Sequence, residues 1–364
     1  MDVIRGLVAL ALPFVDQVWQ VYVLIFVLQS ASAGFTPTFQ ATIPDVLPEE
    51  KDYTRALSLS RFAYDMESLT SPMLAAALLT VMNFHWLFSG TAIGFACSAL
   101  LVLTTVLPRS TAVKAKGGIY DNTTRGARLY LRTPRLRGLL AVTLAAAAAS
   151  AMVIVNTPVL VQAALGLGQR EVAITLAAFG GGSMLAALLL PRVLDKLPDR
   201  TVMLAAAAAM TVALAVLALA WHGHASPNDW GVILAGWAVL GIAYSASITP
   251  GGRLLRRSSG EDDRPALFAA QFALSHVCWL IAYPLAGQLG AAGGMGAALA
   301  ASAVLALVGT VIAFRIWPAN DPEILAHTHD DLAPDHPHLA EGHPDGTASH
   351  AFMIDELHPH WPLR

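Results

Sequence analysis

The sequence predicts an all-α polytopic membrane protein whose ten transmembrane helices form two bundles. The first reason is composition: 55% of the 364 residues are hydrophobic and 13% are charged, whereas soluble domains average about 45–50% apolar residues. The second reason is spacing, because the apolar residues gather in runs close to the roughly 20 residues that cross a bilayer as a helix. The third reason is that short polar joints separate these runs. A soluble helical protein would show shorter helices with a polar stripe.

The apolar runs define ten spans along the chain. An acidic joint, PEEKDY at 48–53, separates the second span from the third, and another, GEDDRP at 260–265, separates the eighth from the ninth. The ten predicted spans are 3–15, 18–46, 53–82, 86–107, 136–165, 171–190, 201–221, 230–255, 264–289 and 295–317. An even number of crossings places both ends of this region on one side of the membrane.

Arginine and lysine lie almost entirely in alternate joints. The joint at 108–137 holds the largest group, and the segments 191–200 and 253–257 hold the others. The opposite joints contain little beyond Arg170. Because cytoplasmic joints carry the excess of Lys and Arg, we expect a bacterial-type inner (plasma) membrane protein with its basic side and both termini in the cytoplasm.

Two segments more than two hundred residues apart repeat nearly the same phrase. Residues 30–37 read SASAGFTP and residues 245–250 read SASITP, and an acidic joint follows each of them. Beyond the joints, an Ala-Leu pair, a Phe-Ala pair and a proline recur in the same order, so that the whole series has offsets of 210 to 215 residues. A series at nearly constant offset indicates two membrane halves repeated in the same orientation.

Two longer segments resemble a known family. FTPTFQATIPDVLPEEKDYTRALSLS (35–60) resembles the segment that joins helices four and five of facilitator-type efflux pumps, and PRVLDKLPDRTVML (191–204) resembles their Asp/Arg-rich turn after helix eight. Over residues 1–318 the chain thus resembles an efflux-type transporter of the major facilitator superfamily. The resemblance implies secondary transport by alternating access about a midplane site, and no enzymatic activity. It also implies a cytoplasmic gate turn formed by Asp195, Lys196, Asp199 and Arg200.

The resemblance implies boundaries as well, because the ten spans correspond to helices three to twelve of the family. The first two helices are then missing, so we interpret the chain as N-terminally truncated or as starting at a misassigned Met1. The implied parts are an incomplete N-terminal bundle (1–107), a basic cytoplasmic inter-bundle linker (108–137), a six-helix C-terminal bundle (138–318) and a His-rich cytoplasmic tail (319–364). We expect a monomer in the lipid bilayer, with no nucleic-acid partner.

The third span places three charged residues inside the membrane, Arg61, Asp65 and Glu67. At the rise of an α-helix, Asp65 lies about 18 Å along the span and close to the bilayer midplane. Each such charge costs roughly 2.5–3.5 kcal/mol on insertion scales, so it must pair or face water. Arg61 and Asp65 are i,i+4 neighbours that can pair, while Glu67 lies about 200° away from Asp65 around the helix. We predict that Asp65 or Glu67 is a proton- or cation-coupling carboxylate; a structural ion pair is the alternative.

The matching span of the second half offers two further polar residues. Gln271 aligns with Arg61, and His276 falls at a similar depth. Because histidine titrates near neutral pH and binds metals as neutral imidazole, His276 is either a functional group of the pathway or a hydrogen-bonding partner of a neighbouring helix. Helices four, seven and ten line the cavity in the family, and the resemblance therefore adds four cavity candidates. They are Gln29, Gln40, Asn156 and Tyr244.

Residues 319–364 are polar, spaced by proline and rich in histidine, which predicts a mobile tail. Its candidate metal ligands are His327, His329, His336, His338, His343, His350, His358 and His360. Imidazole and carboxylate suit Ni²⁺, Co²⁺ or Zn²⁺, and the tail resembles those of nickel-resistance exporters in the same superfamily. The alternative is a tail that binds no metal and docks back on the protein. The docking residues would be Phe352, Ile354, Leu357 and Trp361. No resident cofactor is expected.

The sequence leaves three functions open. The first is ion-coupled export of a small organic or amphipathic solute, which the segment 35–60 favours. The second is export of Ni²⁺ or Co²⁺ with a metal-collecting tail, and the third is a non-transporting truncated membrane protein or metal sensor. A nucleotide-driven pump is not expected, because the Gly-rich FGGGSM at 179–184 lacks the lysine of a phosphate-binding loop. That segment predicts close helix packing instead.

Overall fold

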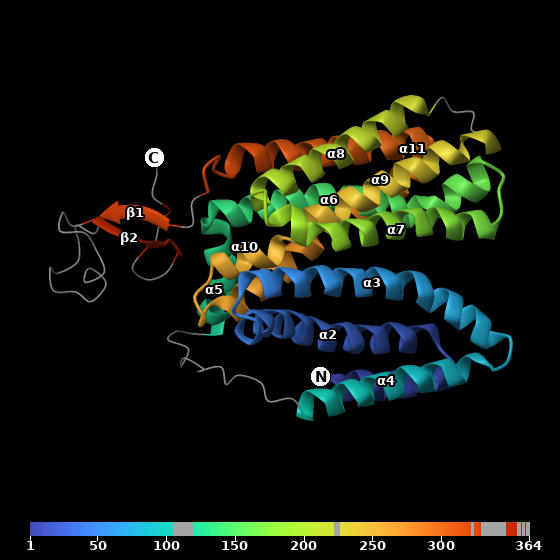
Figure 1. Ribbon diagram of the computed structural model, residues 1–364. Coiled ribbons are helices and arrows are strands. Elements are labelled where there is room, and N and C mark those ends of the chain that lie inside the picture. Colours follow the sequence, from blue (N-terminus) through green and yellow to red (C-terminus); the bar gives the residue numbers. More distant parts are fainter. Residues whose placement is uncertain are drawn as a thin grey trace. The chain divides into compact units, whose positions relative to one another are not determined.

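The computed structural model is helical over most of the chain that it describes (Figure 1). The structure describes residues 1–104, 119–221, 226–321, 324–328, 347–354, 358 and 361. The chain divides into two compact units, Met1–Ala112, called unit 1, and Val113–Arg364, called unit 2.

The described part of unit 1 consists of four α-helices. They are α1 (Asp2–Ala11), α2 (Val18–Val46), α3 (Glu50–Leu79) and α4 (Phe84–Thr104), and a 3₁₀ turn (Leu12–Phe14) follows α1. Helix α1 packs against α2 and α4. Pro13 in the 3₁₀ turn ends α1, because proline lacks the backbone N–H that would continue the helix. Acidic Glu50 and Asp52 stabilise the first turn of α3, where the helix dipole favours negative charge.

Unit 2 contains the α-helices α5 to α11. They are α5 (Ile119–Arg132), α6 (Pro134–Pro158), α7 (Gln169–Leu194), α8 (Asp199–Ala220), α9 (Trp230–Ile248), α10 (Gly251–Arg257) and α11 (Arg264–Ile316), with a π-helical turn η2 (Val159–Ala164) after α6 and a 3₁₀ turn η3 (Pro227–Asp229) before α9. Helix α6 is central, and most of its residues between 139 and 153 are buried. It packs along α11 through small buried side chains, which let two helices approach closely. These are Ala147, Ala151, Cys278, Ala282 and Ala286.

Helices α7 and α9 touch through glycine. A Cβ atom added to Gly182 of α7 would lie 2.3 Å from the carbonyl oxygen of Ala238, and one added to Gly241 of α9 would lie 1.9 Å from that of Phe179. No real Cβ atom fits at such distances, so both positions require glycine. The interpretation of FGGGSM as a helix-packing segment is therefore confirmed.

Each of the ten predicted spans corresponds to a helical segment, although the segments are divided differently. In the described part of the chain, seven helices are long and apolar enough to cross a bilayer. Helix α1, with 10 residues, is shorter than a spanning helix, and α3 is more polar. The 53 residues of α11 contain the last two predicted spans, which meet at Gly294, whose φ of 77° suits glycine. Thr249 and Pro250 divide the eighth predicted span into α9 and α10.

Two elements of unit 2 were not expected from the sequence. Helix α5 lies within the predicted linker and docks on the beginning of α11, where Arg125 donates a hydrogen bond of 2.7 Å to Asp263. In the predicted tail, β1 (Ile324–Thr328) and β2 (Thr347–Ala351) form an antiparallel hairpin. Its register pairs Leu325 with His350 and His327 with Ala348. Part of the tail is therefore ordered by backbone hydrogen bonds rather than mobile as predicted.

Candidate functional site

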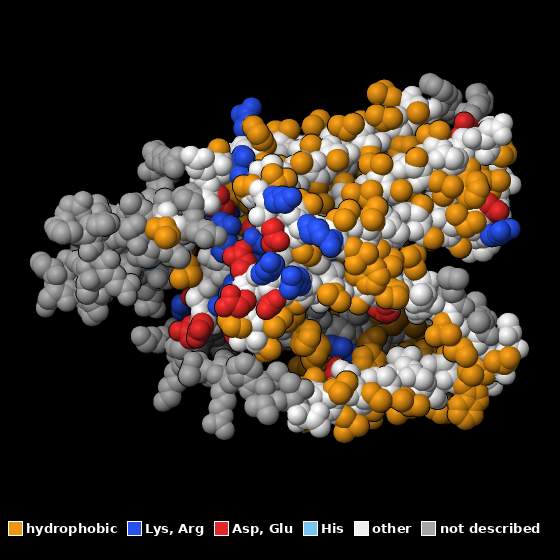
Figure 2. All heavy atoms as spheres, viewed as in Figure 1, with side chains coloured by type: hydrophobic (Ala, Val, Ile, Leu, Met, Phe, Trp, Pro, Cys, Tyr) orange, Lys and Arg blue, Asp and Glu red, His pale blue; other side chains and the backbone are white. Residues whose placement is uncertain are grey.

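Charged side chains of unit 2 gather at the end of the helices where α10 lies, while hydrophobic side chains dominate the sides of the helices (Figure 2). This distribution fits a bilayer, which penalises charge in its core and accepts it at the interface. We call this region the Asp199 end. Its central residues are Arg135, Asp199, Arg253, Arg257 and Asp321.

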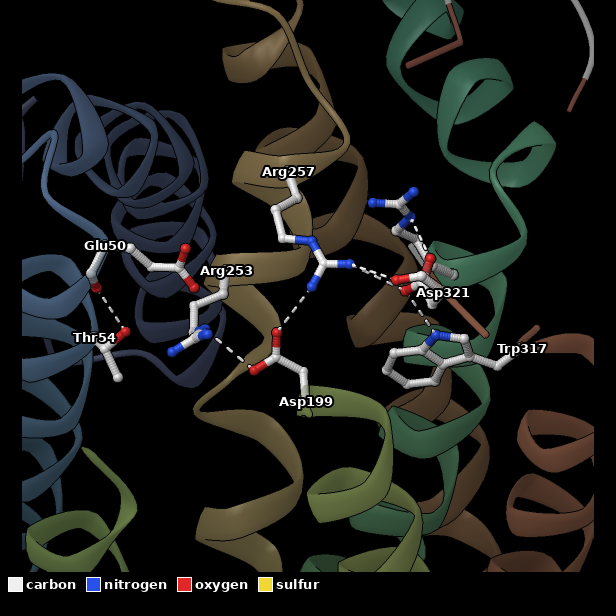
Figure 3. A network of polar contacts seen from close by, with 8 residues as sticks. Glu50, Thr54, Asp199, Arg253, Arg257, Trp317 and Asp321 are labelled. Atoms are coloured by element: carbon white, nitrogen blue, oxygen red, sulfur yellow. Dashed lines mark hydrogen bonds and ion pairs between the residues drawn. The ribbon is translucent and has the colours of Figure 1, made fainter. Parts of the chain in front are cut away.

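Asp199, the first residue of α8, is buried beside two arginines of α10 (Figure 3). Its Oδ1 lies 3.1 Å from Nε of Arg253, and its Oδ2 lies 3.4 Å from Nη1 of Arg257. The carboxylate also lies in the first turn of its helix, where the dipole favours negative charge. Asp199 therefore ties the beginning of α8 to the short helix that follows the Thr249–Pro250 break.

Arg257 extends the network to Asp321, which lies just after α11 (Figure 3). Asp321 Oδ2 is 3.3 Å from Arg257 Nη2, and Asp321 Oδ1 is 3.2 Å from Nε of Arg135 at the start of α6. The indole N–H of Trp317 also donates a hydrogen bond of 3.1 Å to Asp321. Arg135 is only 1% exposed, so its charge depends on these contacts. The network thus joins α6, α8, α10 and the segment after α11.

The four residues of the predicted gate turn have different surroundings. Asp199 belongs to the network, and Arg200 donates hydrogen bonds to the carbonyl oxygens of Trp317 (3.3 Å) and Phe314 (3.5 Å) at the end of α11. Asp195 and Lys196 are exposed. The structure therefore brings Asp199 and Arg200 into interhelical contacts, and the gate role of the turn stays a prediction.

In unit 1, Asp65 of α3 is buried and receives two hydrogen bonds from Arg61. Arg61 Nε donates to Oδ2 at 3.1 Å and Nη2 donates to Oδ1 at 2.5 Å. The guanidinium group also lies 5.2 Å from the centre of the Tyr64 ring. The pair that the i,i+4 spacing predicts is thus formed on one helix. The Glu67 side chain is exposed and makes no hydrogen bond or ion pair with the described part of the chain.

Gln271 of α11 accepts a hydrogen bond from the hydroxyl group of Tyr130, which is buried at the end of α5. Burial raises the pKa of Tyr130 well above its ordinary value, and the nearby Cys278 adds to this shift. Gln271 therefore holds the linker helix against α11. A role in the substrate pathway stays a prediction.

His276 forms its hydrogen bond within its own helix rather than with a neighbouring one. Its Nδ1 lies 2.6 Å from the carbonyl oxygen of Phe272, and its ring packs 4.2 Å from the Phe272 ring. Because a carbonyl oxygen only accepts, Nδ1 donates this hydrogen bond, and Nε2 takes no part in it. The side chain is exposed, so this nitrogen is accessible from outside the helix.

The other cavity candidates differ in burial. Asn156 is buried near the end of α6 and donates a hydrogen bond of 3.2 Å to the carbonyl oxygen of Ala286. Tyr244 is half-buried, with its ring 5.5 Å from that of Phe179. Gln29 and Gln40 are exposed on α2 of unit 1.

Sequence reasoning missed a contact beside Asn156. The indole N–H of Trp237 donates a hydrogen bond of 2.8 Å to the hydroxyl oxygen of Thr157, and both side chains are fully buried. The Thr157 hydroxyl group in turn donates to the carbonyl oxygen of Val153. The π-helical turn η2 begins two residues later, and such turns concentrate at functional positions. The Thr-Pro pair at 157–158 is a sequence signal that could have indicated this break.

Most of the predicted metal ligands cannot be placed in the fold. His329, His336, His338, His343 and His360 lie outside the described residues. The hairpin register puts positions 327 and 350 on the same face, because their cross-strand partners are 348 and 325. His358 is buried with its ring 4.8 Å from that of Phe352. Among the residues whose side chains are described, no three His, Cys, Asp or Glu residues are grouped to hold a metal ion.

Comparisons with known proteins show which family this chain matches and which solved structures have a similar fold. The model of the Major Facilitator Superfamily matches the chain over residues 3–220 and again over residues 139–341. The fold is similar to that of a bacterial homologue of the iron transporter ferroportin in an outward-facing state, with a TM-score of 0.65 and 15% identity over 86% of this chain and 79% of that chain. It is also similar to the E. coli fucose:proton symporter, with a TM-score of 0.62 and 12% identity over 86% of this chain and 81% of that chain. No curated protein matches the sequence.

Proposed function

The chain belongs to the major facilitator superfamily, and on that premise we propose that this secondary transporter exports a small organic or amphipathic solute by ion-coupled alternating access. The proposal assigns the Asp199 end to the cytoplasm. The concentration of arginine there supports this assignment, since cytoplasmic ends of membrane helices carry the excess of positive charge.

The proposal of ion coupling depends on one observation, the buried Asp65 and its ion pair with Arg61 on the same helix. Asp65 is buried, and the two hydrogen bonds from Arg61 stabilise its charge. Both residues lie on α3, so this ion pair forms within one helix. A carboxylate in this situation can bind a proton in one state of the transporter and release it in the other.

Glu67 is the second carboxylate that the proposal includes. It lies two residues from Asp65 on a different side of α3, and it is exposed. An exposed carboxylate at this depth of a spanning segment is costly in lipid but favourable beside a water-filled pathway. We therefore assign the coupling function to Asp65, with Glu67 facing the pathway.

The experiment is gradient-driven flux in liposomes that contain the full chain, with ethidium as the fluorescent organic probe. An imposed pH gradient should move ethidium in the wild type, and Asp65→Asn should abolish this movement, as should Glu67→Gln if it faces the pathway. Asp52→Asn is the matched control, because Asp52 lies on the same helix in an exposed pair with Arg55. Flux at the wild-type rate in both Asp65→Asn and Glu67→Gln would make the cluster structural.

A second candidate function, export of Ni²⁺ or Co²⁺, is favoured by the hairpin in the tail. The hairpin register brings the positions of His327 and His350 to one face, and imidazole is a preferred ligand of these ions. A tail peptide of residues 319–364 should then bind Ni²⁺ with an affinity that falls as pH drops below about 6.5, because protonated imidazole cannot ligate.

Calorimetry of the peptide measures that binding, and Ni²⁺ replaces ethidium as the probe in the liposome experiment. Metal export requires that Ni²⁺ flux follow the pH gradient and that His276→Ala lower it. Ni²⁺ binding by the peptide without Ni²⁺ flux would leave a metal-binding tail on a transporter for another solute. No flux of either probe would favour a protein that does not transport these solutes.

A further inference from the structure

The C-terminal segment of the chain forms an aromatic cluster at the Asp199 end of unit 2. The Phe352 ring contacts the rings of His358 and Trp361, with centroids 4.8 Å and 5.1 Å away and edge-on geometry. Phe352, Ile354 and His358 are all buried. Edge-on contacts of this kind are the preferred arrangement of aromatic pairs. The described residues from 352 to 361 are therefore packed rather than freely exposed.

Trp361 connects this cluster to the helices. Its ring lies 4.8 Å from the guanidinium carbon of Arg135, which is a cation–π distance. Arg135 is buried at the start of α6, and buried cations gain most from an aromatic face because little water competes. The same guanidinium group pairs with Asp321. The Arg135 guanidinium group thus contacts both the C-terminal segment and the ion network.

The ion network carries this contact to α10. From Asp321 the contacts lead to Arg257 of α10 and from there to Asp199 of α8. Helix α10 is short and is separated from α9 by Thr249 and Pro250, a break at which a helix can bend. These ion pairs therefore help to set the position of α10 relative to α8 and α6, together with the buried side chains of Leu254 and Leu255.

We propose that the C-terminal segment is an intramolecular clamp: docked through Trp361 on Arg135, it holds the ion network in place, restrains α10 and slows the transport cycle. Removal of the Trp361 ring leaves Arg135 with one stabilising contact fewer. Arg135 then has more freedom to change its position, and Asp321 and Arg257 follow it. The inference depends on the proposed transport for its effect on rate but not for its effect on α10.

Amide hydrogen exchange of the full chain in lipid nanodiscs tests the effect on α10 without any transport substrate. Trp361→Ala should raise exchange of the α10 amides (251–257) about tenfold, because local opening depends on the contacts that are lost. Exchange in α7 (169–194), outside the network, should not change. Trp361→Phe keeps an aromatic face and should behave like the wild type, and Trp86→Ala removes an indole that is 65% exposed in unit 1 as a matched control.

Arg135→Lys is the second variant. It keeps the charge but loses the planar group that stacks on an indole, so it should also raise α10 exchange. Unchanged α10 exchange in both Trp361→Ala and Arg135→Lys would overturn the clamp, as would an equal rise in α7, which would mean general loosening of unit 2.

Ethidium flux in liposomes tests the effect on rate. Trp361→Ala should increase the flux several-fold over the wild type, and an unchanged or lower flux in a chain whose α10 exchange has risen would overturn the braking function. If the wild type moves no ethidium, the proposed export fails for this probe while hydrogen exchange still decides whether the clamp exists.

Discussion

Two buried ionic sites in the described part of the chain differ in what they connect. The Arg61–Asp65 pair of unit 1 lies on a single helix, α3. The Asp199 network of unit 2 joins α6, α8, α10 and the segment after α11. The Arg61–Asp65 ion pair does not itself join α3 to a neighbouring helix. The Asp199 network joins several elements, so we expect it to hold a conformation, whereas the proposed coupling function belongs to the Arg61–Asp65 pair.

The largest expected effect comes from breaking the network at Asp199. Asp199→Asn removes the negative charge that Arg253 and Arg257 share. Because removal of one partner leaves buried charge uncompensated, we expect the free energy of unfolding of unit 2 to fall by about 3 kcal/mol. Unfolding by sodium dodecyl sulfate in mixed micelles, followed by circular dichroism, measures this loss. Asp195→Asn, at an exposed position, is the control. Equal stability of the two variants would contradict the interhelical role of Asp199.

The corresponding change in unit 1 should have a smaller effect on stability. In Asp65→Asn, Arg61 keeps its contact with the Tyr64 ring, and the asparagine can still accept a hydrogen bond. We therefore expect a loss of about 1 kcal/mol, measured in the same way. If Asp65→Asn destabilised the chain as much as Asp199→Asn does, the distinction between a coupling pair and a holding network would be wrong.

The hydrogen bond between Tyr130 of α5 and Gln271 of α11 adds an uncharged interhelical contact to the comparison of the two ionic sites. The pKa of Tyr130 is raised in the folded state, so the fold favours the neutral phenol. Its contribution to the free energy of unfolding is therefore fully present below about pH 10, the ordinary pKa of tyrosine, and is lost as pH rises through the pKa of the folded state. Tyr130→Phe should lose about 1 kcal/mol at neutral pH, with the hydrogen bond to Gln271.

The measurement is the unfolding free energy of both proteins from about pH 8 to about pH 11. The difference between wild type and Tyr130→Phe should shrink at the alkaline end of this range. A difference that stays constant with pH would show that ionisation of Tyr130 is not linked to folding.

Much of the fold could be predicted because lipid imposes a simple rule on sequence. The ten apolar runs correspond to helical segments, since each must satisfy its backbone within a helix. The Arg61–Asp65 contact followed from helix geometry alone, because both partners lie one turn apart. Helix α5 is short and basic, so its sequence carries no signal of a membrane span and indicates a linker instead.

The Asp199 network could not be predicted, because its members are distant in sequence. Asp321 falls in a segment that reads as the beginning of a polar tail, and nothing local indicates that it meets Arg135 at the start of α6. The sequence also did not indicate that the two copies of the repeated phrase differ in structure. In the first copy α2 continues through Thr36 and Pro37, whereas in the second α9 ends before Thr249 and Pro250.

The glycine contacts between α7 and α9 have a mechanical consequence. At Gly182 and Gly241 the two backbones touch reciprocally, and a rotation of either helix about its own axis would push a neighbouring Cβ atom into a carbonyl oxygen. Helices α7 and α9 therefore resist rotation against each other and should move together as a rigid pair. That stiffness ends where α9 ends, at Thr249 and Pro250. Beyond this point the short helix α10 begins, and Pro250 is a position at which the chain between α9 and α10 can bend.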